Sequence, residues 1–319
     1  MYEYDYRVTV IGGGTGLSSI LRGLKKFPLD ITAIVTVADD GSSSGSLREQ
    51  LDIPPPGDIR NVLVALSEAE PLVNELFQYR FEEGSGLAGH PTGNLLLAAM
   101  TKITGNFATA VANLSDVLNV RGRILPVCNE ALCLCAEYED GAVATGESNI
   151  AQLNKKIKRV YYKENCSALA DAVRAVCEAD LVVLAPGSLY TSIIPNLLFP
   201  EMKSAIKTTR AKFVYCCNIM SQPGETTNFS VLDHVDAIES HVGFSFVDTV
   251  FANDGKIRKD ILQKYLDDGA NIIEIDYESL TKSNIEVVSS RMVDYNDADE
   301  IRHDSKKIAA LLFSLLLDV

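Results

Sequence analysis

A cluster of glycines directly after an apolar run near the N-terminus could hold a phosphate group. The run at 8–11 is rich in β-branched residues, and helical patterning begins at Leu17. A glycine-rich turn between a strand and a helix lets backbone N–H groups approach a phosphate at the positive end of the helix. Because Leu17 stands where the dinucleotide-binding fingerprint has its third glycine, the turn does not specify the ligand, and an ordinary tight turn is the alternative. The residues of this predicted phosphate loop are Gly12, Gly13, Gly14, Thr15 and Gly16.

Two adjacent carboxylates, Asp39 and Asp40, follow the apolar run at 31–37. An acidic side chain at the end of the second strand of an α/β fold can accept hydrogen bonds from ribose or sugar hydroxyls. The same oxygens suit Mg²⁺ that a ligand carries on its phosphates, because such an ion needs no dedicated protein cage. Capping of a turn by aspartate is the alternative interpretation.

Three further segments combine glycine with polar side chains beside a predicted strand or helix. In an open α/β sheet the carboxyl ends of the strands form the ligand crevice, so we expect these segments to converge with the phosphate loop on one nucleotide cleft. Each segment taken alone is also compatible with an ordinary turn. The predicted ligand-binding residues in them are His90 and Asn94 in 89–95, Gly187 and Ser188 in 185–192, and Asn218 before 222–226.

Apolar runs that alternate with helical patterns must position these residues. The alternation predicts an α/β, Rossmann-like fold with a mostly parallel sheet flanked by helices. Alternating residues around 140–141 predict a hairpin, and we expect a small antiparallel insertion at about 121–162 within one domain that spans 1–319. The stretch 42–58 is rich in serine and proline and is expected to be a flexible loop. The predicted strands are 7–11, 31–37, 181–184, 212–218 and 247–252, and the predicted helices include 17–26, 59–81, 94–118 and 308–317.

The composition is that of an ordinary globular protein with an acidic surface. The chain has 319 residues, of which 47% are hydrophobic and 23% are charged, and its net charge is −14. Such a charge repels phosphate backbones and anionic lipids, so nucleic acid and membrane surfaces are not expected as partners. The N-terminus lacks a signal-peptide pattern, and the longest apolar run, 308–317, is far shorter than the ~20 residues that span a bilayer, so we expect a cytoplasmic location. The oligomeric state stays open, a homo-oligomer included.

The spacings of cysteine and histidine predict no dedicated metal site. The seven cysteines form no CxxC pair, and the four histidines form no HExxH pattern. Reduced thiols in a cytosolic protein are the expectation, with a catalytic cysteine as the alternative. No GxSxG element supports a Ser-His-Asp triad, and the sequence assigns no residue a catalytic role.

Six segments carry a joint pattern in this order: VIGGGTGLSSILRGL, VTVADDGSSSGSLR, PPGDIRNVLVAL, GHPTGNLLLA, LVVLAPGSLYTSIIPNLL, and SQPGET with LDHV. Together they resemble the gluconeogenesis factor (YvcK-like) proteins, bacterial relatives of 2-phospho-L-lactate transferase within the CofD-like family. The resemblance extends from about residue 7 to Asp304. The family loop usually reads DDGGSSGRLR, whereas Ser42 and Ser46 stand here for a glycine and an arginine. This exchange removes a positive charge from the loop, and Arg48 is the candidate substitute.

The resemblance implies a Rossmann-like protein that binds a nucleotide sugar such as UDP-N-acetylglucosamine and acts as a cytoplasmic regulator without turnover. It also implies that the protein is needed for growth and cell shape on gluconeogenic carbon sources. Tyr265 and Arg302 resemble C-terminal contacts of the bacterial proteins to the nucleotide sugar, since a tyrosine ring can stack on a base and a guanidinium suits a diphosphate. No cofactor is required in this interpretation, apart from Mg²⁺ that could accompany the nucleotide.

Two other functions stay open. The transferase relatives move a phospholactyl group from a guanosine-diphosphate donor to a deazaflavin acceptor with the help of Mg²⁺. The chain has no tryptophan and only 7% aromatic residues, which argues against a broad aromatic slot for a deazaflavin. A scaffold protein with a vestigial nucleotide site is the third possibility, and the intact glycine loop argues against it.

Overall fold

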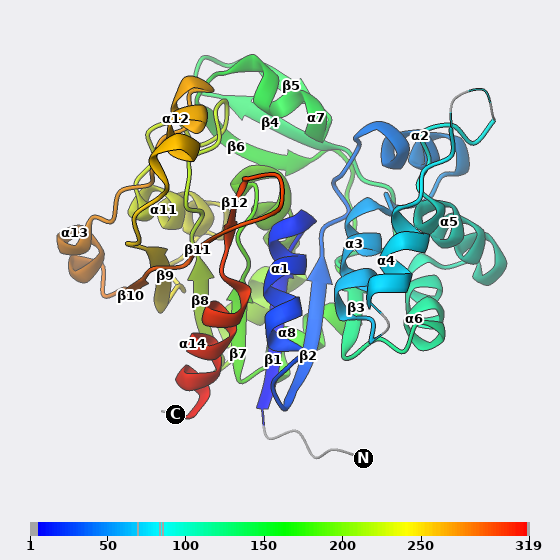
Figure 1. The fold of residues 1–319 in the computed structure, drawn as a ribbon, viewed down its shortest axis with the longest axis horizontal. Helices are drawn as coiled ribbons and strands as arrows, with labels where there is room; N and C mark the ends of the chain where they lie inside the picture. Colours follow the sequence, from blue (N-terminus) through cyan, green and yellow to red (C-terminus); the bar gives the residue numbers. More distant parts are fainter. Residues whose placement is uncertain (1–5, 69, 83, 85, 318–319) are drawn as a thin grey trace.

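One seven-stranded parallel sheet forms the centre of the fold (Figure 1). The computed structural model describes residues 6–68, 70–82, 84 and 86–317. Every pairing in the main sheet is parallel, so the predicted α/β fold with a mostly parallel sheet is confirmed. From one edge to the other the strands are β10 (Glu286–Ser290), β9 (Thr249–Asn253), β8 (Lys212–Cys216), β7 (Leu181–Leu184), β1 (Tyr6–Gly12), β2 (Leu29–Val35) and β3 (Arg123–Pro126).

The central strands are apolar along their whole length because helices cover both faces of the sheet. All four residues of β7 are buried, as are the last five of β1. On one face α1 (Gly14–Leu24) packs against α14 (Ser305–Leu317) and α3 (Gly57–Leu66). On the other, α8 (Ala170–Glu178) contacts β1, β3 and α10 (Pro200–Thr208).

The order of the strands reverses direction at β1. The chain runs from β1 outward to β2 and β3, and it then returns to the other side of β1 for β7 and the strands that follow. The loops after β1 and β7 therefore leave adjacent strands toward opposite faces of the sheet. Such a switch point leaves a crevice at the carboxyl ends of the strands, and this is where ligands bind in open α/β sheets.

The helices between β2 and β3 are shorter and more numerous than the sequence suggests. The predicted helix 59–81 divides into α3 and α4 (Glu70–Gln78). The predicted helix 94–118 divides into α5 (Thr92–Thr104) and α6 (Phe107–Val117), because Gly105 closes α5 with a φ of 71° and Asn106 caps α6. Within the described chain no single helix is long and apolar enough to cross a bilayer, and α5 with α6 reaches that length only across a bend of 119°.

The segment predicted as a flexible loop at 42–58 instead contains helix α2 (Ser42–Leu51). This helix ends at Asp52, whose φ of 49° is left-handed, and three prolines follow before α3 begins at Gly57. The low hydrophobicity of the serines concealed the helix. Its buried side chain Leu47 packs with Ile53 and Ala98 in a small core.

A three-stranded antiparallel sheet lies beyond the carboxyl end of the main sheet (Figure 1). The antiparallel insertion expected at about 121–162 is therefore present. It begins later than expected because Arg123–Pro126 pairs with β2 as the last strand of the main sheet. The elements of the insertion are β4 (Leu134–Tyr138), β5 (Val143–Thr145), α7 (Glu147–Ile150), the 3-10 turn η1 (Ala151–Leu153) and β6 (Ile157–Tyr162).

Elements from the C-terminal third also lie near the carboxyl end of the main sheet. The short antiparallel pair β11 (Val293–Tyr295) and β12 (Ile301–His303) shares a small apolar core with α12 (Lys259–Asp267). Tyr265 and Tyr295 pack against this core. The remaining elements are the π turn η2 (Leu189–Ile193), α9 (Ile194–Leu197), α11 (Val231–Val242) and α13 (Tyr277–Lys282).

Gly23 sets the distance between α1 and α14. A Cβ at this position would lie 2.1 Å from the carbonyl oxygen of Ser305 and 2.8 Å from the Cβ of Ala309. We therefore expect Gly23→Ala to force the two helices apart and to lower the free energy of unfolding by about 1–3 kcal/mol. Chemical denaturation followed by circular dichroism measures this loss.

Gly86→Ala is the matched control, because nothing lies within 4 Å of the position where its Cβ would be placed. We expect this control to change stability by less than about 0.5 kcal/mol. Equal stability of the two variants would contradict the proposed packing of α1 on α14.

Candidate functional site

A cleft of about 210 Å³ opens at the switch point of the sheet, where the N-terminal half of α1 and the loops after β7 and β8 meet α12 and β12. It brings together residues that are as far apart in sequence as Thr15 and Arg302. Six of the fourteen residues predicted to bind the ligand line it: Thr15, Gly16, Gly187, Asn218, Tyr265 and Arg302. Sequence reasoning missed other lining residues, among them Ser19, Met220, Gln222 and His303.

The wall of the cleft depends on a close approach of two backbones at Gly16. A Cβ at Gly16 would lie 2.0 Å from the carbonyl oxygen of Pro186. Only glycine allows the first turn of α1 to come this near to the loop after β7. Gly187 continues that loop with a φ of 156° and also lines the cleft. These glycines therefore allow the two backbones to come together as one wall of the cleft.

Asn218 and Ser188 hold the loop after β7 in place. The amide of Asn218 accepts a hydrogen bond from the N–H of Gly187 at 2.9 Å and donates one to its carbonyl oxygen at 2.7 Å. The hydroxyl of Ser188 donates to Glu225 at 2.5 Å and accepts from the backbone N–H of Thr191 at 3.1 Å. Ser188 does not line the cleft within the described chain, so its role is to cap the turn and to position Glu225.

Tyr265 and Arg302 come from different elements and meet at β12. The hydroxyl of Tyr265 accepts a hydrogen bond from the backbone N–H of Ile301 at 3.1 Å, so α12 and β12 are held together. The guanidinium of Arg302 donates to the carbonyl oxygen of Ile301 at 3.0 Å and pairs with Glu300, and its side chain is 41% exposed. The cleft thus has one aromatic ring and one accessible cation on its C-terminal wall.

His303 adds a neutral imidazole to the same wall. Burial lowers the pKa of His303 to about 4, although its contact with the carbonyl oxygen of Cys217 at 3.0 Å favours the protonated form. With this lowered pKa the ring is uncharged at neutral pH, so it offers hydrogen bonding and packing on this wall.

A group of acidic side chains lies beside the phosphate loop and contains residues that the sequence did not single out. Burial, followed by the charge of Asp39, raises the pKa of Asp58 to about 7, although the N–H of Gly14 opposes this shift. Burial and Asp39 also raise the pKa of Glu147 to about 7. Burial raises the pKa of Glu225. We refer to Asp39, Asp58, Glu147 and Glu225 as the acidic cluster. Burial and mutual repulsion therefore favour the protonated forms of Asp58 and Glu147.

The first glycines of the phosphate loop face this acidic cluster and do not line the cleft. A Cβ at Gly13 would lie 2.4 Å from Oδ2 of Asp58, and the N–H of Gly14 is hydrogen-bonded to the same carboxyl group. Gly12 is buried at the end of β1, where an added Cβ would approach Ala185 to 3.1 Å. Its carbonyl oxygen accepts the N–H of Thr36 at 2.9 Å. Gly12 and Gly13 therefore serve close packing at the switch point.

The two predicted aspartates have different surroundings. Asp39 belongs to the acidic cluster and caps its own turn, since its Oδ1 accepts from the N–H of Gly41 at 2.9 Å. Asp40 reaches the insertion, where its Oδ1 accepts from the N–H of Ser148 at 2.8 Å. A Cβ at Gly146 would lie 2.4 Å from Oδ2 of Asp40. Asp40 thus fastens the insertion to the loop after β2.

His90 and Asn94 belong to a separate polar network and do not reach the cleft. The Nδ1 atom of His90 lies 2.8 Å from the hydroxyl of Ser43, which also accepts from the amide of Asn94 at 3.1 Å. The amide oxygen of Asn94 accepts from the guanidinium of Arg60 at 2.9 Å. Burial and then Arg80 lower the pKa of Arg60, whereas Asp39 and Asp58 raise it. The network therefore places a buried cation next to the acidic cluster.

Arg48, the candidate substitute for the missing loop arginine, is used elsewhere. Its guanidinium donates to the carbonyl oxygen of Leu132 at 2.9 Å, just before the insertion. Ser46 accepts a hydrogen bond from Gln50 one helical turn later at 2.9 Å. Neither residue lines the cleft, so the positive charge on its described walls comes from Arg302.

Of the missed residues, Asp58 and Arg60 had a signal in the sequence, because they lie in the motif PPGDIRN beside the helix start at Gly57. Glu147 had none. It sits on the insertion, and only the folding of that insertion over the sheet brings it to Asp39.

Comparison with known proteins agrees with this fold and this order of motifs. The family model described as 2-phospho-L-lactate transferase CofD matches residues 8–293. The gluconeogenesis factor of Bacillus subtilis strain 168 is 52% identical over 311 residues, which cover 97% of this chain and 98% of that protein. The gluconeogenesis factor of Listeria monocytogenes is 46% identical over 315 residues, which cover 98% of this chain and 97% of that protein.

The solved structure of protein BH3568 from Bacillus halodurans is also similar. It superposes with a TM-score of 0.93 at 50% sequence identity, covering 97% of this chain and 99% of that chain. The resemblance inferred from the motifs is confirmed over nearly the whole length, and the chain belongs to the CofD family.

Proposed function

We propose that this protein is a regulatory gluconeogenesis factor that binds a nucleotide sugar of the UDP-N-acetylglucosamine type in the switch-point cleft and releases it unchanged. The observation that carries the proposal is the convergence of six predicted ligand residues from five segments on one cleft. Relatives with 52% and 46% identity that bear the name gluconeogenesis factor support the physiological role. That role is support of growth and cell shape on gluconeogenic carbon, in the cytoplasm where such nucleotides are made.

The chemistry of the cleft suits a diphosphate in an acidic protein. With a net charge of −14, the protein has to hold an anion locally. The first turn of α1 presents backbone N–H groups near Thr15 and Gly16, and the guanidinium of Arg302 stands on the opposite wall. The ring of Tyr265 is available to stack on the base or the sugar. A volume of about 210 Å³ is small for a whole cofactor, so we expect part of the ligand to remain exposed.

The acidic cluster fits a magnesium ion that accompanies the diphosphate. Carboxylate oxygens are the ligands that Mg²⁺ prefers. Burial first and the charge of Asp39 second raise the pKa values of Asp58 and Glu147, so a nearby cation would favour their ionised forms. We propose that Asp39 and Asp58 would hold such an ion and that it would neutralise charge on the phosphates. The fold itself does not require it.

A transferase that moves a phospholactyl group is the second candidate, and the family match favours it. The lining of the cleft argues against a transferase. A deazaflavin acceptor needs a broad aromatic slot, whereas among the described lining residues Tyr265 is the one Phe, Tyr or Trp side chain. A scaffold with a vestigial site would show no ligand-dependent stabilisation.

We expect UDP-N-acetylglucosamine to raise the melting temperature of the purified protein, whereas GDP, NAD and a deazaflavin leave it nearly unchanged. Saturation at 100 times the dissociation constant corresponds to about 2.7 kcal/mol of added stability. Mass spectrometry of the same mixtures with Mg²⁺ should recover the nucleotide sugar intact. Multiple turnovers to a new phosphodiester would favour the transferase, and no stabilisation by any nucleotide would favour the scaffold.

Tyr265→Ala and Arg302→Ala should each weaken binding of the nucleotide sugar about tenfold or more in calorimetry, because stacking and charge pairing on one wall are lost. Tyr265→Phe separates the ring from the hydroxyl that holds Ile301, and we expect it to retain most of the affinity. Tyr277→Ala on α13, which is 49% exposed, and Arg174→Ala on α8 are matched controls. Equal losses in variants and controls would exclude this cleft as the binding site.

Asp58→Asn should stabilise the ligand-free protein more at pH 8 than at pH 5. A carboxyl group whose pKa rises from 3.8 to about 7 on folding binds its proton more tightly in the folded state, so its contribution to stability falls as the pH rises through that window. Asparagine removes this dependence. We expect the melting temperature of Asp58→Asn relative to that of the unmodified protein to rise by about 2 °C or more between pH 5 and pH 8.

The exposed Asp116→Asn on α6 is the control for that comparison and should show a constant difference. Addition of Mg²⁺ at pH 8 should raise the melting temperature of the unmodified protein more than that of Asp58→Asn. A pH-independent effect of Asp58→Asn would show that this carboxyl group is not crowded by negative charge.

A further inference from the structure

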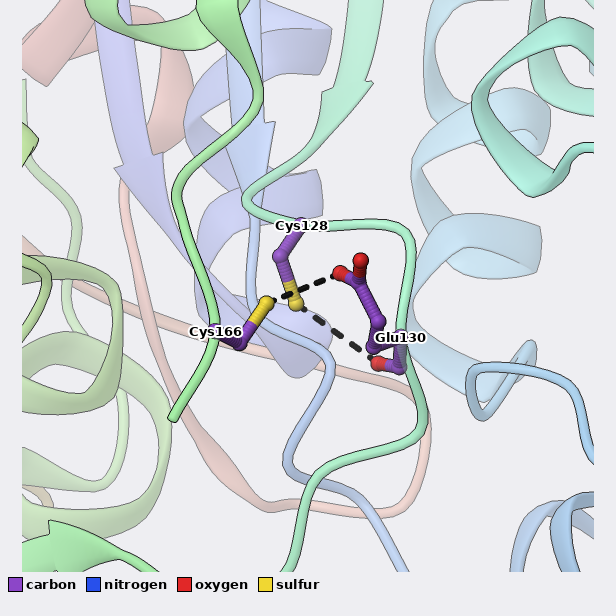
Figure 2. Close-up of side chains that lie close together, drawn as sticks. All are labelled: Cys128, Glu130 and Cys166. Atoms are coloured by element: carbon purple, nitrogen blue, oxygen red, sulfur yellow. Dashed lines mark hydrogen bonds between the residues drawn. The ribbon is translucent and has the colours of Figure 1, made fainter. Parts of the chain in front are cut away.

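Two cysteines and a glutamate meet at the base of the insertion, between the segments 127–133 and 163–169, which we call its neck (Figure 2). Cys128 and Glu130 follow β3 in the segment that enters the insertion, and Cys166 follows β6 in the segment that leaves it. One ligand atom from each residue lies within 4.8 Å of the others, and among the described residues this is the one such group of three. Cys128 is buried, Cys166 is half-buried and Glu130 is exposed.

Both thiols are directed at the same residue. The Sγ atom of Cys166 donates to the carboxylate of Glu130 at 2.8 Å, and the Sγ atom of Cys128 donates to the backbone carbonyl oxygen of Glu130 at 3.6 Å. Figure 2 shows the two sulfur atoms and the carboxylate facing one another between the two segments of the neck. The donors therefore already surround a common point.

Hydrogen bonds of the backbone hold the two segments of the neck in this arrangement. The N–H of Leu169 donates to the carbonyl oxygen of Val127 at 2.7 Å, next to Cys128. The N–H of Lys163 donates to the carbonyl oxygen of Cys133 at 3.0 Å, and the N–H of Cys133 donates to Glu164 at 2.8 Å. Because these bonds flank the thiols on both sides, an ion would find its ligands largely preorganised.

We propose that Cys128, Glu130 and Cys166 bind one thiophilic divalent cation of the Zn²⁺ class. Two thiolates with one carboxylate form a ligand set that favours zinc over magnesium or calcium. Zinc–sulfur bonds of about 2.3 Å place tetrahedral sulfur ligands about 3.8 Å apart. This spacing is compatible with ligand atoms that all lie within 4.8 Å of one another. On binding, each thiol releases its proton to solvent, and water completes the tetrahedron on the exposed side of Glu130.

The ion would link the two segments of the neck and so stabilise the position of the insertion relative to the main sheet. The insertion carries Glu147 of the acidic cluster and the Ser148 amide that holds Asp40. Fixing its neck therefore fixes the placement of those groups over the carboxyl end of the sheet. The proposal concerns a site separate from the nucleotide cleft, because none of its three ligands lines that cleft.

Titration of the full-length, reduced protein with Co²⁺ tests the proposal. We expect one equivalent to bind and to give the intense visible bands of tetrahedral cobalt with thiolate ligands, and Zn²⁺ should displace it and raise the melting temperature. Cys166→Ser should abolish the bands, and Glu130→Gln should weaken Co²⁺ binding about tenfold or more. These two residues are half-buried and exposed, so their variants are expected to fold, which circular dichroism checks.

Cys133→Ser and Cys177→Ser are the matched controls. Cys133 belongs to the other thiol pair near the neck, with Cys135, and Cys177 is exposed on α8. Both controls should bind Co²⁺ like the unmodified protein. Loss of the bands in Cys133→Ser, their persistence in folded Cys166→Ser, or no binding of Co²⁺ at all would overturn the proposal. So would joint protection of Cys128 and Cys166 from alkylation in freshly isolated, metal-free protein, which would identify a disulfide.

Discussion

The close approach of α1 to the loop after β7 is the contact on which the rest of the site depends. At Gly16 the two backbones are so near that a Cβ would lie 2.0 Å from the carbonyl oxygen of Pro186. Asn218 holds the same loop by two hydrogen bonds from the next strand end. With this contact in place, α1 and the loops after β7 and β8 form one wall, and α12 with β12 closes the cleft from the other side. A side chain at Gly16 would push α1 away from the loop after β7.

Negative charge is concentrated just before the same helix turn, where Asp58 lies against Gly13 and Gly14. Asp39, Asp58 and Glu147 come from the loop after β2, from α3 and from the insertion. After burial, the charge of Asp39 is the largest cause that raises the pKa of both Asp58 and Glu147. A nearby cation favours the ionised form of such carboxyl groups, and the buried Arg60 is a cation that lowers the pKa of Asp58. The site therefore combines a cleft that carries the cation Arg302 with an acidic cluster beside the start of α1, and this division suits a ligand that carries both phosphates and a cation.

The insertion links the two features. It supplies Glu147, and its Ser148 amide is bonded to Asp40 directly after Asp39. Its neck contains Cys128, Glu130 and Cys166, and Arg48 of α2 is bonded to Leu132 at the same place. Whatever stabilises the neck therefore stabilises the arrangement of carboxylates over the sheet. This dependence gives a structural reason for a three-stranded antiparallel sheet beside the parallel main sheet.

The sequence by itself determined the fold class and the switch-point loops, because buried parallel strands and glycine-rich turns are local patterns. It also pointed to Tyr265 and Arg302 through a family resemblance, and both line the cleft. Only the tertiary structure decided which predicted residues share a site: His90 and Asn94 bond to Ser43 and Arg60, and Asp40 bonds to the insertion. The grouping of Glu147 with Asp58, and of Cys128 with Cys166, had no signal in local spacing. Such groupings arise from long-range packing, which pairs segments that the chain itself keeps far apart.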